Sequence, residues 1–312
     1  MLFPLRRLSA LALALPIASC GELVSLDEGT VVHLGGPGRR PGRFVTPRAI
    51  SVAGDWLFVV DRSGRVQGLT LDGQQRREVI VVEGERGFPI GIVGDAAGGF
   101  VLCDTHSSRL RFFDGEFSET GSLGAEGQGE GQFTLPQRIA RDDEGRLYVT
   151  EYGEGPANRV QVFDAERRFL FSFGSFGTGP GQFTRAMGVA IIGDEVFVAD
   201  VSDRILVHDR SGRYLREFGT SGVGLGELRY PYGLCAIGDT LYVCEYANHR
   251  VQRFDRMGHS TGSFGRAGRG RGEFDGPWDI TCDEAGLLYV CDTGNHRVVV
   301  FDPQQVPWVS AE

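Results

Sequence analysis

The sequence predicts an all-β fold, a six-bladed β-propeller in which six repeated units of four strands close into a ring. A glycine-rich segment ending in a large apolar residue recurs six times, at intervals of 44 to 50 residues. The intervals hold short, alternating apolar runs that are typical of strands. No window shows an apolar helical period long enough for a core helix, and ring closure leaves few open sheet edges. The six segments end at Phe44, Phe88, Phe133, Phe183, Leu228 and Phe274.

The start of the chain is expected to lie outside the ring. Arg6 and Arg7 precede an apolar run over residues 8–16, which is too short to span a bilayer. Residues 17–20, IASC, resemble the bacterial lipobox, in which the cysteine is lipidated and becomes the new N-terminus. We expect a lipoprotein signal peptide over residues 1–19, lipidation of Cys20 and a short tether over residues 20–29. An ordinary signal peptide cut at another site is the alternative.

This segment predicts an exported protein, lipid-anchored to the cell envelope at the outer membrane or at the periplasmic face of a membrane. Gly21 after the cysteine favours the outer membrane if the host is Gram-negative. The formal net charge is −9, and it falls to −11 once Arg6 and Arg7 leave with the signal peptide. Such an acidic chain is a poor binder of nucleic acid, whose phosphates need a basic face. Residues 265–274, GRAGRGRGEF, are therefore a connector whose glycines recur, because other copies replace the arginines.

Each blade is expected to hold strands a, b, c and d, of which the fourth has the weakest signal. Blade 3 shows them at residues 136–142, 146–151, 158–164 and 169–174. Blade 5 repeats them at residues 231–237, 240–245, 248–255 and 260–265, and blade 6 shows three at residues 277–283, 286–292 and 295–302. The pattern closely resembles the NHL-repeat family, in which a strand ending in Asp precedes Asn-His-Arg-Val and a strand ending in Phe-Asp. The resemblance covers nearly all of residues 30–302, is weakest in blades 1 and 2, and implies a six-bladed propeller.

Blade 6 lacks a fourth strand of its own, because only a ten-residue tail, residues 303–312, follows it. Residues 29–36, GTVVHLGG, look like a fourth strand without the preceding three. We therefore expect this N-terminal strand to pair with residues 297–302 and complete the last blade. Antiparallel alternation then places the start of a, the end of b and the connectors at one end of the ring, here called the top. The chain from Cys20 enters from the opposite end, the bottom.

An acid ends strand b in every blade, and an arginine opens strand c. A ring of carboxylates could hold a metal or serve acid–base chemistry, but one arginine per acid favours a structural ion pair inside each blade. His249 and His296 belong to the same motif and are interpreted as structural hydrogen-bonding groups. The acids are Asp61, Asp104, Glu151, Asp200, Glu245 and Asp292, and the arginines are Arg65, Arg109, Arg159, Arg204, Arg250 and Arg297.

The positions that differ between blades predict the functional site. Near the start of strand a, four blades carry Ala or Gly, whereas blades 3 and 6 carry Arg138 and Asp279. These two charges face each other across the channel, either as a salt-bridged plug or as part of a ligand site. The predicted binding site at the top mouth consists of Arg48, Arg138, Tyr152, Tyr232, Tyr246, Trp278 and Asp279.

Five cysteines follow Cys20. A nine-residue spacing relates Cys235 to Cys244 and Cys282 to Cys291, so disulfides are conceivable, but the diagonal geometry favours buried thiols. An odd count leaves at least one thiol unpaired within the chain. No haem or zinc motif is present, and no cofactor is predicted.

Two functions remain open at this point. Amidating lyases and gluconolactonases resemble this chain in fold and hold metals in the channel, which would make the chain an enzyme with its site at the top. No histidine begins strand a here, and Asp279 is the only acid at that level. The favoured prediction is a non-catalytic, membrane-tethered propeller that serves as a protein-interaction or accessory subunit of a bacterial envelope assembly. Its expected partners are other envelope proteins and, through the lipid anchor, the membrane.

Overall fold

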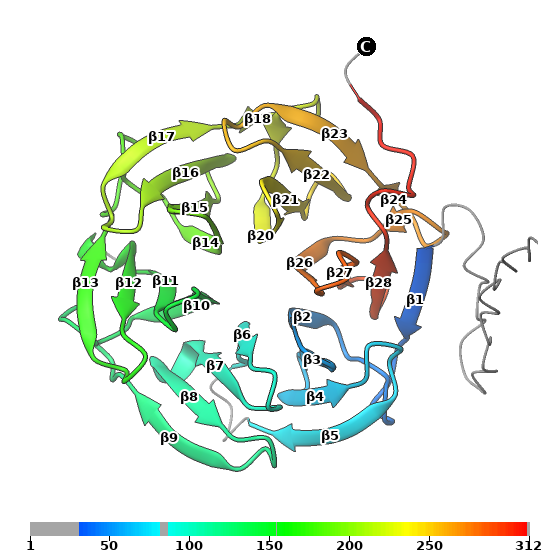
Figure 1. Ribbon diagram of the computed structural model, residues 1–312, viewed down its shortest axis with the longest axis horizontal. Helices are drawn as coiled ribbons and strands as arrows, with labels where there is room; N and C mark the ends of the chain where they lie inside the picture. The colour runs from blue at the N-terminus through cyan, green and yellow to red at the C-terminus, as the bar shows by residue number, and fades with distance from the viewer. Residues whose placement is uncertain (1–30, 82–86, 154, 311–312) are drawn as a thin grey trace, which may run out of the picture.

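The computed structural model describes residues 31–81, 87–153 and 155–310, and these residues form six four-stranded antiparallel sheets around a central axis (Figure 1). The prediction of an all-β, six-bladed propeller is confirmed. Two single-turn 3₁₀ helices, η1 (Thr105–Ser107) and η2 (Gly155–Ala157), follow strand b in blades 2 and 3. Within the described ranges no helix is long and apolar enough to span a bilayer. The predicted signal peptide, Cys20 and the tether lie outside the described residues.

The strands run from the axis outward as a, b, c and d. Blades 1 and 2 are β2 (Pro47–Ala53), β3 (Trp56–Asp61), β4 (Arg65–Leu69), β5 (Gln75–Ile80) and β6 (Gly91–Gly94), β7 (Phe100–Asp104), β8 (Arg109–Phe113), β9 (Glu119–Leu123). Blades 3 and 4 are β10 (Leu135–Arg141), β11 (Leu147–Tyr152), β12 (Arg159–Phe163), β13 (Phe169–Phe173) and β14 (Ala186–Ile192), β15 (Glu195–Asp200), β16 (Arg204–Asp209), β17 (Tyr214–Phe218). Blade 5 is β20 (Pro231–Ile237), β21 (Thr240–Glu245), β22 (Arg250–Phe254) and β23 (Ser260–Phe264).

Blade 6 contains β26 (Pro277–Cys282), β27 (Leu288–Asp292) and β28 (Arg297–Phe301) from the end of the described chain. Its outer strand is β1 (Val31–Gly35), which runs antiparallel to β28 in the order β1-β28-β27-β26 (Figure 1). Val31 lies opposite Phe301, and Gly35 lies opposite Arg297. The chain therefore enters β1 at the bottom, where strand c ends, and leaves β1 at the top.

The connectors between blades are short, glycine-rich and anchored by one buried side chain. Two of them contain a parallel pair of two-residue strands, β18 (Thr220–Ser221) with β19 (Glu227–Leu228) and β24 (Arg266–Ala267) with β25 (Glu273–Phe274), and three others contain a single parallel bridge, Pro37 with Phe44, Glu126 with Phe133 and Phe176 with Phe183. Gly265 has a φ of 105°, and a Cβ there would overlap the ring of Phe274, which is fully buried. The repeated pairing of glycine with a terminal aromatic residue thus reflects close packing in a left-handed backbone conformation.

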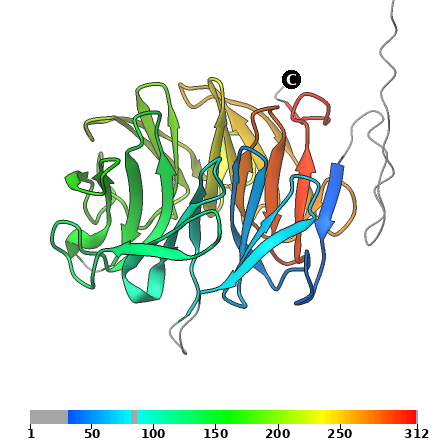
Figure 2. The same ribbon diagram turned by 60° about the horizontal axis from the view of Figure 1, so that its bottom comes forward.

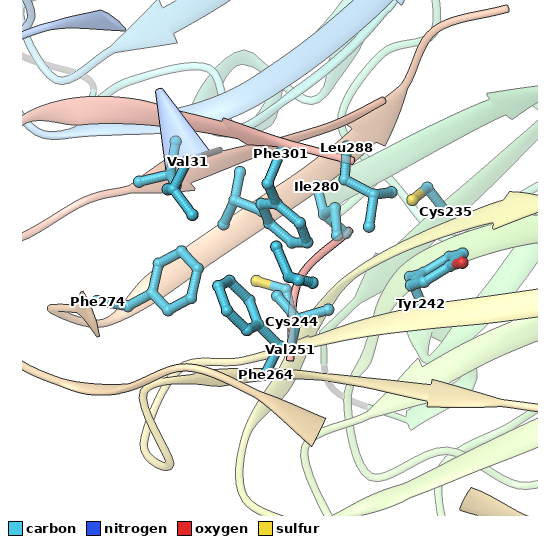
Figure 3. Packing of buried hydrophobic residues seen from close by; sticks show 13 residues of the cluster. Val31, Cys235, Tyr242, Cys244, Val251, Phe264, Phe274, Ile280, Leu288 and Phe301 are labelled. Carbon is cyan, nitrogen blue, oxygen red and sulfur yellow. The ribbon is translucent and has the colours of Figure 1, made fainter. Parts of the chain in front are cut away.

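Hydrophobic side chains fill the space between neighbouring blades. Figure 3 shows the cluster at blades 5 and 6, where Cys244, Val251 and Phe264 face Leu288 and Phe301. Val31 of β1 packs into the same cluster, so the outer strand of blade 6 contributes to the core as well as to the sheet. The ring has its core distributed over six such interfaces, which is why each repeat needs its neighbours.

The predicted C-terminal tail packs on blade 5. Val309 exchanges two backbone hydrogen bonds with Ser263 of β23, at 2.8 and 2.9 Å. Trp308 lies against Tyr242 and Phe264, and the guanidinium of Arg253 sits 4.7 Å from the centre of its ring. The tail thereby covers part of the outer edge of blade 5, which the sequence pattern did not indicate (Figures 1 and 2).

Candidate functional site

Irregular pairing at the start of strand a positions side chains at the channel mouth. In blades 1, 5 and 6 one residue of the inner strand is skipped in the pairing with strand b. The skipped residues are Arg48, Tyr232 and Trp278, three of the predicted site residues. A bulge of this kind bends the strand and redirects the side chain. Blades 3 and 4 skip two residues, Gln137 with Arg138 and Met187 with Gly188.

The next position is small because the inner strands crowd the axis. A Cβ at Gly233 would lie 2.7 Å from the Cα of Asp279, and one at Gly188 would lie 2.7 Å from the carbonyl oxygen of Tyr232. Both separations are too short for a side chain. This crowding explains why four blades carry Ala or Gly at this position and makes the charged residues of blades 3 and 6 exceptions.

Arg138 and Asp279 meet at the axis. The Nε of Arg138 lies 3.5 Å from the Oδ1 of Asp279, and both side chains are buried, with 5% and 9% of their surface exposed. Asp279 also accepts hydrogen bonds from the backbone amides of Ile50 and Ile280, both at 3.1 Å. Burial raises the pKa of Asp279 to about 6, and Arg138 opposes this shift. The two side chains form a buried ion pair that links blades 3 and 6, here called the plug.

Two cavities accompany this pair. The upper one, about 320 Å³, is lined by Arg48, Arg62, Phe88, Tyr152, Arg185 and Trp278 among others. The lower one, about 230 Å³, is lined by Arg138, Asp279 and mainly aliphatic residues of the inner strands. Arg138 donates from Nη2 to the carbonyl of Arg48, at 3.1 Å, and so ties the plug to the wall of the upper cavity. We call the upper cavity and the aromatic residues beside it the mouth.

Blades 5 and 6 contribute an aromatic cluster to the mouth. The ring of Trp278 lies 4.5 Å from that of Tyr232 and 5.2 Å from that of Tyr246, measured between centres. The guanidinium of Arg48 stacks over Trp278 at 4.3 Å. Tyr246 is 38% exposed and Tyr230, beside Tyr232, is 47% exposed. The structure thus brings four of the predicted residues into one continuous surface.

Tyr152 lies on the other side of the mouth with residues that the sequence did not single out. The guanidinium of Arg185 stacks over its ring at 3.9 Å, and Arg62 lies 5.9 Å from the ring of Phe88. Arg62 and Arg185 occupy loop positions just after strand b and just before strand a. Arg62 had a signal in the sequence, because it follows the strand-b acid as Tyr152 and Tyr246 do, whereas Arg185 lies in a loop whose residues differ from blade to blade.

The ring of acids and arginines is structural. In all six blades the predicted acid and arginine form an ion pair, with N–O distances between 2.6 and 3.4 Å. In five blades the same arginine also donates to carbonyl groups of the preceding connector, as Arg250 does to Val223, Gly224 and Glu227. His249 accepts from the amide of Gly276, and His296 accepts from the amide of Thr46, each at 3.0 Å. Both histidines therefore join one blade to the next, in keeping with their interpretation as structural hydrogen-bonding groups.

The five cysteines of the described chain are free thiols, and four of them are buried. Cys235 lies opposite Tyr242, whereas Cys244 lies opposite Gly233, so the two cysteines are diagonal rather than paired. Burial raises the pKa of the thiols of Cys103, Cys244 and Cys291. Buried thiols, the favoured interpretation, agree with this geometry.

The channel does not fit the metal centres of the enzymes that resemble this fold. Across residues 31–81, 87–153 and 155–310, no three His, Cys, Asp or Glu side chains are grouped so that they could hold an ion. Asp279 is the acid at the inner-strand level, and it is occupied by Arg138 and two backbone amides. We therefore derive no metal-dependent step for this site.

Comparison with known proteins supports the fold. The NHL repeat family model matches residues 274–301. Curated protein sequences give no significant match. Among solved structures, a streptogramin B lyase is similar with a TM-score of 0.61 and 11% identity, covering 87% of this chain and 97% of its own.

Two further enzymes share the architecture with similar TM-scores and identities. Virginiamycin B lyase from Staphylococcus aureus has a TM-score of 0.60, 13% identity and coverage of 88% of this chain and 99% of its own. A gluconolactonase from Xanthomonas campestris has a TM-score of 0.61, 14% identity and coverage of 88% and 98%. At these identities the likeness concerns the fold alone. The recurring strand motif, the family-model match in blade 6 and the six-bladed ring together support an NHL-repeat β-propeller.

Proposed function

We propose that the protein is a non-catalytic, membrane-tethered propeller that binds another protein of the cell envelope through its mouth. The observation that carries this proposal is the cluster of Arg48, Trp278 and Tyr232 at a position where the other three blades carry Ile90, Gln137 and Met187. Arginine and aromatic residues dominate the energetics of protein interfaces. Tyr230 and Tyr246 extend the same cluster to the solvent, so a partner can reach it.

The entry of the chain supports a tethered orientation. Val31 lies at the bottom of blade 6, opposite the end of β28, whereas the mouth is at the top. A lipid on Cys20, ten residues before β1, would hold the bottom toward the membrane and leave the mouth free for a partner. Cys20→Ser is expected to abolish metabolic labelling with palmitate, and labelling that persists would remove the anchor from this proposal.

The alternative is a propeller enzyme, either amidating-lyase-like or lactonase-like, with its site at the top of the channel. A streptogramin B lyase and a gluconolactonase share this fold, so the architecture is compatible with the alternative. The plug weighs against it, because the acid at the level of the inner strands is already bound to Arg138. An enzyme of this kind would lose turnover of its substrate on Asp279→Asn, whereas an interaction module would keep its partner.

Site-specific photo-crosslinking tests the proposal in living cells. A benzoylphenylalanine replaces Tyr246 at the mouth or, as a control, Leu170 on the outer strand β13, two side chains with 38% and 45% exposure. We expect a discrete covalent adduct with one envelope protein from position 246 and none from position 170. Equal adducts from both positions, or an adduct from position 170 alone, would move the interface away from the mouth.

A further inference from the structure

The mouth holds three guanidinium groups that no acid neutralises. Arg48, Arg62 and Arg185 line the upper cavity, and none lies within 4.0 Å of a carboxylate among the described residues. This is unusual for the chain, whose formal net charge is −9 and whose strand-c arginines are all paired with acids. The mouth is therefore a cationic pocket on an acidic protein.

Aromatic rings, rather than acids, hold two of these cations in place. Arg48 stacks on Trp278 at 4.3 Å and Arg185 stacks on Tyr152 at 3.9 Å. Stacking fixes the plane of a guanidinium and leaves N–H groups at its edge free to donate. A planar donor edge of this kind matches the two oxygens of a carboxylate.

The mouth also has more hydrogen-bond donors than acceptors. The Nε atoms of Arg48 and Arg185 and the Nε1 of Trp278 are buried and have no hydrogen-bond partner in the described structure. Against these three donors, the described residues that line the cavity supply one buried acceptor without a partner, the Oε1 of Gln137. These three donors are covered by protein atoms, so a ligand with acceptor oxygens would meet the outer Nη groups of Arg48 and Arg185, which are not among the buried atoms. Burial and the nearby charges of Arg62 and Arg138 also lower the pKa of Arg48, as expected where positive charges gather.

We propose that the mouth recognises a carboxylate on an acidic peptide segment of the partner protein, held between the guanidinium groups of Arg48 and Arg185. This inference rests on the proposed function and specifies its ligand. Arg62, which is exposed, adds long-range attraction, and the rings of Trp278 and Tyr152 contact the atoms beside the carboxylate. Because the protein carries a negative net charge, an acidic segment is repelled by the molecule as a whole and attracted by the cationic mouth.

Isothermal titration calorimetry of the full-length protein in detergent tests the inference with defined probes. The first probe is hexaglutamate with both ends blocked, and the matched neutral probe is hexaglutamine with both ends blocked. We expect hexaglutamate to bind at least about 10-fold more tightly, with affinity falling as salt rises. A third probe, hexaglutamine with a free C-terminal carboxylate, distinguishes recognition of a chain end from recognition of acidic side chains.

Paired variants locate the effect at the mouth. The Arg48→Gln and Arg185→Gln double variant should weaken hexaglutamate binding by at least about 30-fold. The Arg39→Gln and Arg40→Gln double variant removes the same charge from an exposed connector on the same face. It should change hexaglutamate affinity by less than about 3-fold, because exposed charges far from the ligand are largely screened. Melting temperatures of both double variants report whether the fold is intact.

Equal binding of the acidic and neutral peptides, or an equal loss in both double variants, would overturn the inference. Absence of hexaglutamate binding at 1 mM, about the weakest affinity that a specific contact provides, would do the same. Tighter binding of hexauridylate than of hexaglutamate would assign the cations to nucleic acid instead. A crosslinked partner at position 246 combined with no preference for hexaglutamate would leave the proposed function standing and this inference refuted.

Discussion

His208 shows how a single side chain in the repeat makes stability depend on pH. The imidazole is buried on β16 among Phe173, Phe183 and Tyr214, with ring centres 4.6 to 5.8 Å away, and its Nδ1 has no hydrogen-bond partner in the described structure. Burial lowers its pKa from 6.5 to about 4. Between pH 6.5 and pH 4 the imidazole of His208 therefore binds a proton in the unfolded chain but not in the folded chain. The free energy of unfolding falls as pH falls through this range.

The corresponding prediction uses the His208→Leu variant. Wild type should lose about 2–3 kcal/mol more than the variant in free energy of unfolding between pH 7 and pH 4, because only wild type has this buried imidazole to protonate. Urea unfolding at a series of pH values measures the difference. Parallel pH profiles for the two proteins would show that His208 does not contribute.

Arg138 and Asp279 form a second residue-scale test. Removing either partner leaves a buried charge without its counterion, so Arg138→Ala and Asp279→Ala should each destabilise the fold, by up to about 3–5 kcal/mol. Asp279→Ala should lower the free energy of unfolding more, because it leaves the guanidinium of Arg138 unpaired, and a guanidinium cannot lose its charge. Arg138→Ala instead leaves the carboxylate of Asp279, whose pKa near 6 allows it to take up a proton. The double variant should recover part of the loss. Additive losses in the double-mutant cycle would rule out a coupled plug.

At the scale of single elements, β1 tests how the ring is held together. Deleting residues 21–36 removes the outer strand of blade 6, uncovers the edge of β28 and takes Val31 out of the core, so stability should fall by several kcal/mol. Deleting residues 21–30 alone removes the proposed tether but leaves β1, and this variant should melt like wild type. If both deletions melted alike, β1 would have no role in stability.

The elements that the sequence predicted best are those that repeat. Strands b and c were located by the acid and arginine that end and begin them, since each ion pair needs both residues in every blade. The tail was missed because residues 303–312 contain two prolines and no alternation, and its pairing with Ser263 depends on a surface that exists only in the closed ring. Arg62 could have been found, since it follows the strand-b acid as Tyr152 and Tyr246 do, but the convergence of Arg62 with Arg185 is set by the ring and has no period in the sequence.

On the scale of the whole molecule, the ring brings residues from all six blades to one mouth, although they are spread from Arg48 to Trp278. A propeller thus builds a site that no single repeat contains. The two ends of the ring also differ, because β1 begins at the bottom and the aromatic and cationic residues gather at the top. That asymmetry is what a tethered binding module requires.

The affinity of the Trp278→Ala variant for its crosslinked partner tests this account most directly. Trp278 contacts Arg48, Tyr232 and Tyr246, so its removal should break the aromatic cluster of the mouth. The side chain is only half-buried, so the fold of blade 6 should be preserved. We predict a loss of at least about 2 kcal/mol in binding free energy, or roughly 30-fold in Kd, with little change in melting temperature. Unchanged affinity in a folded Trp278→Ala protein would contradict the assignment of the partner site to the mouth.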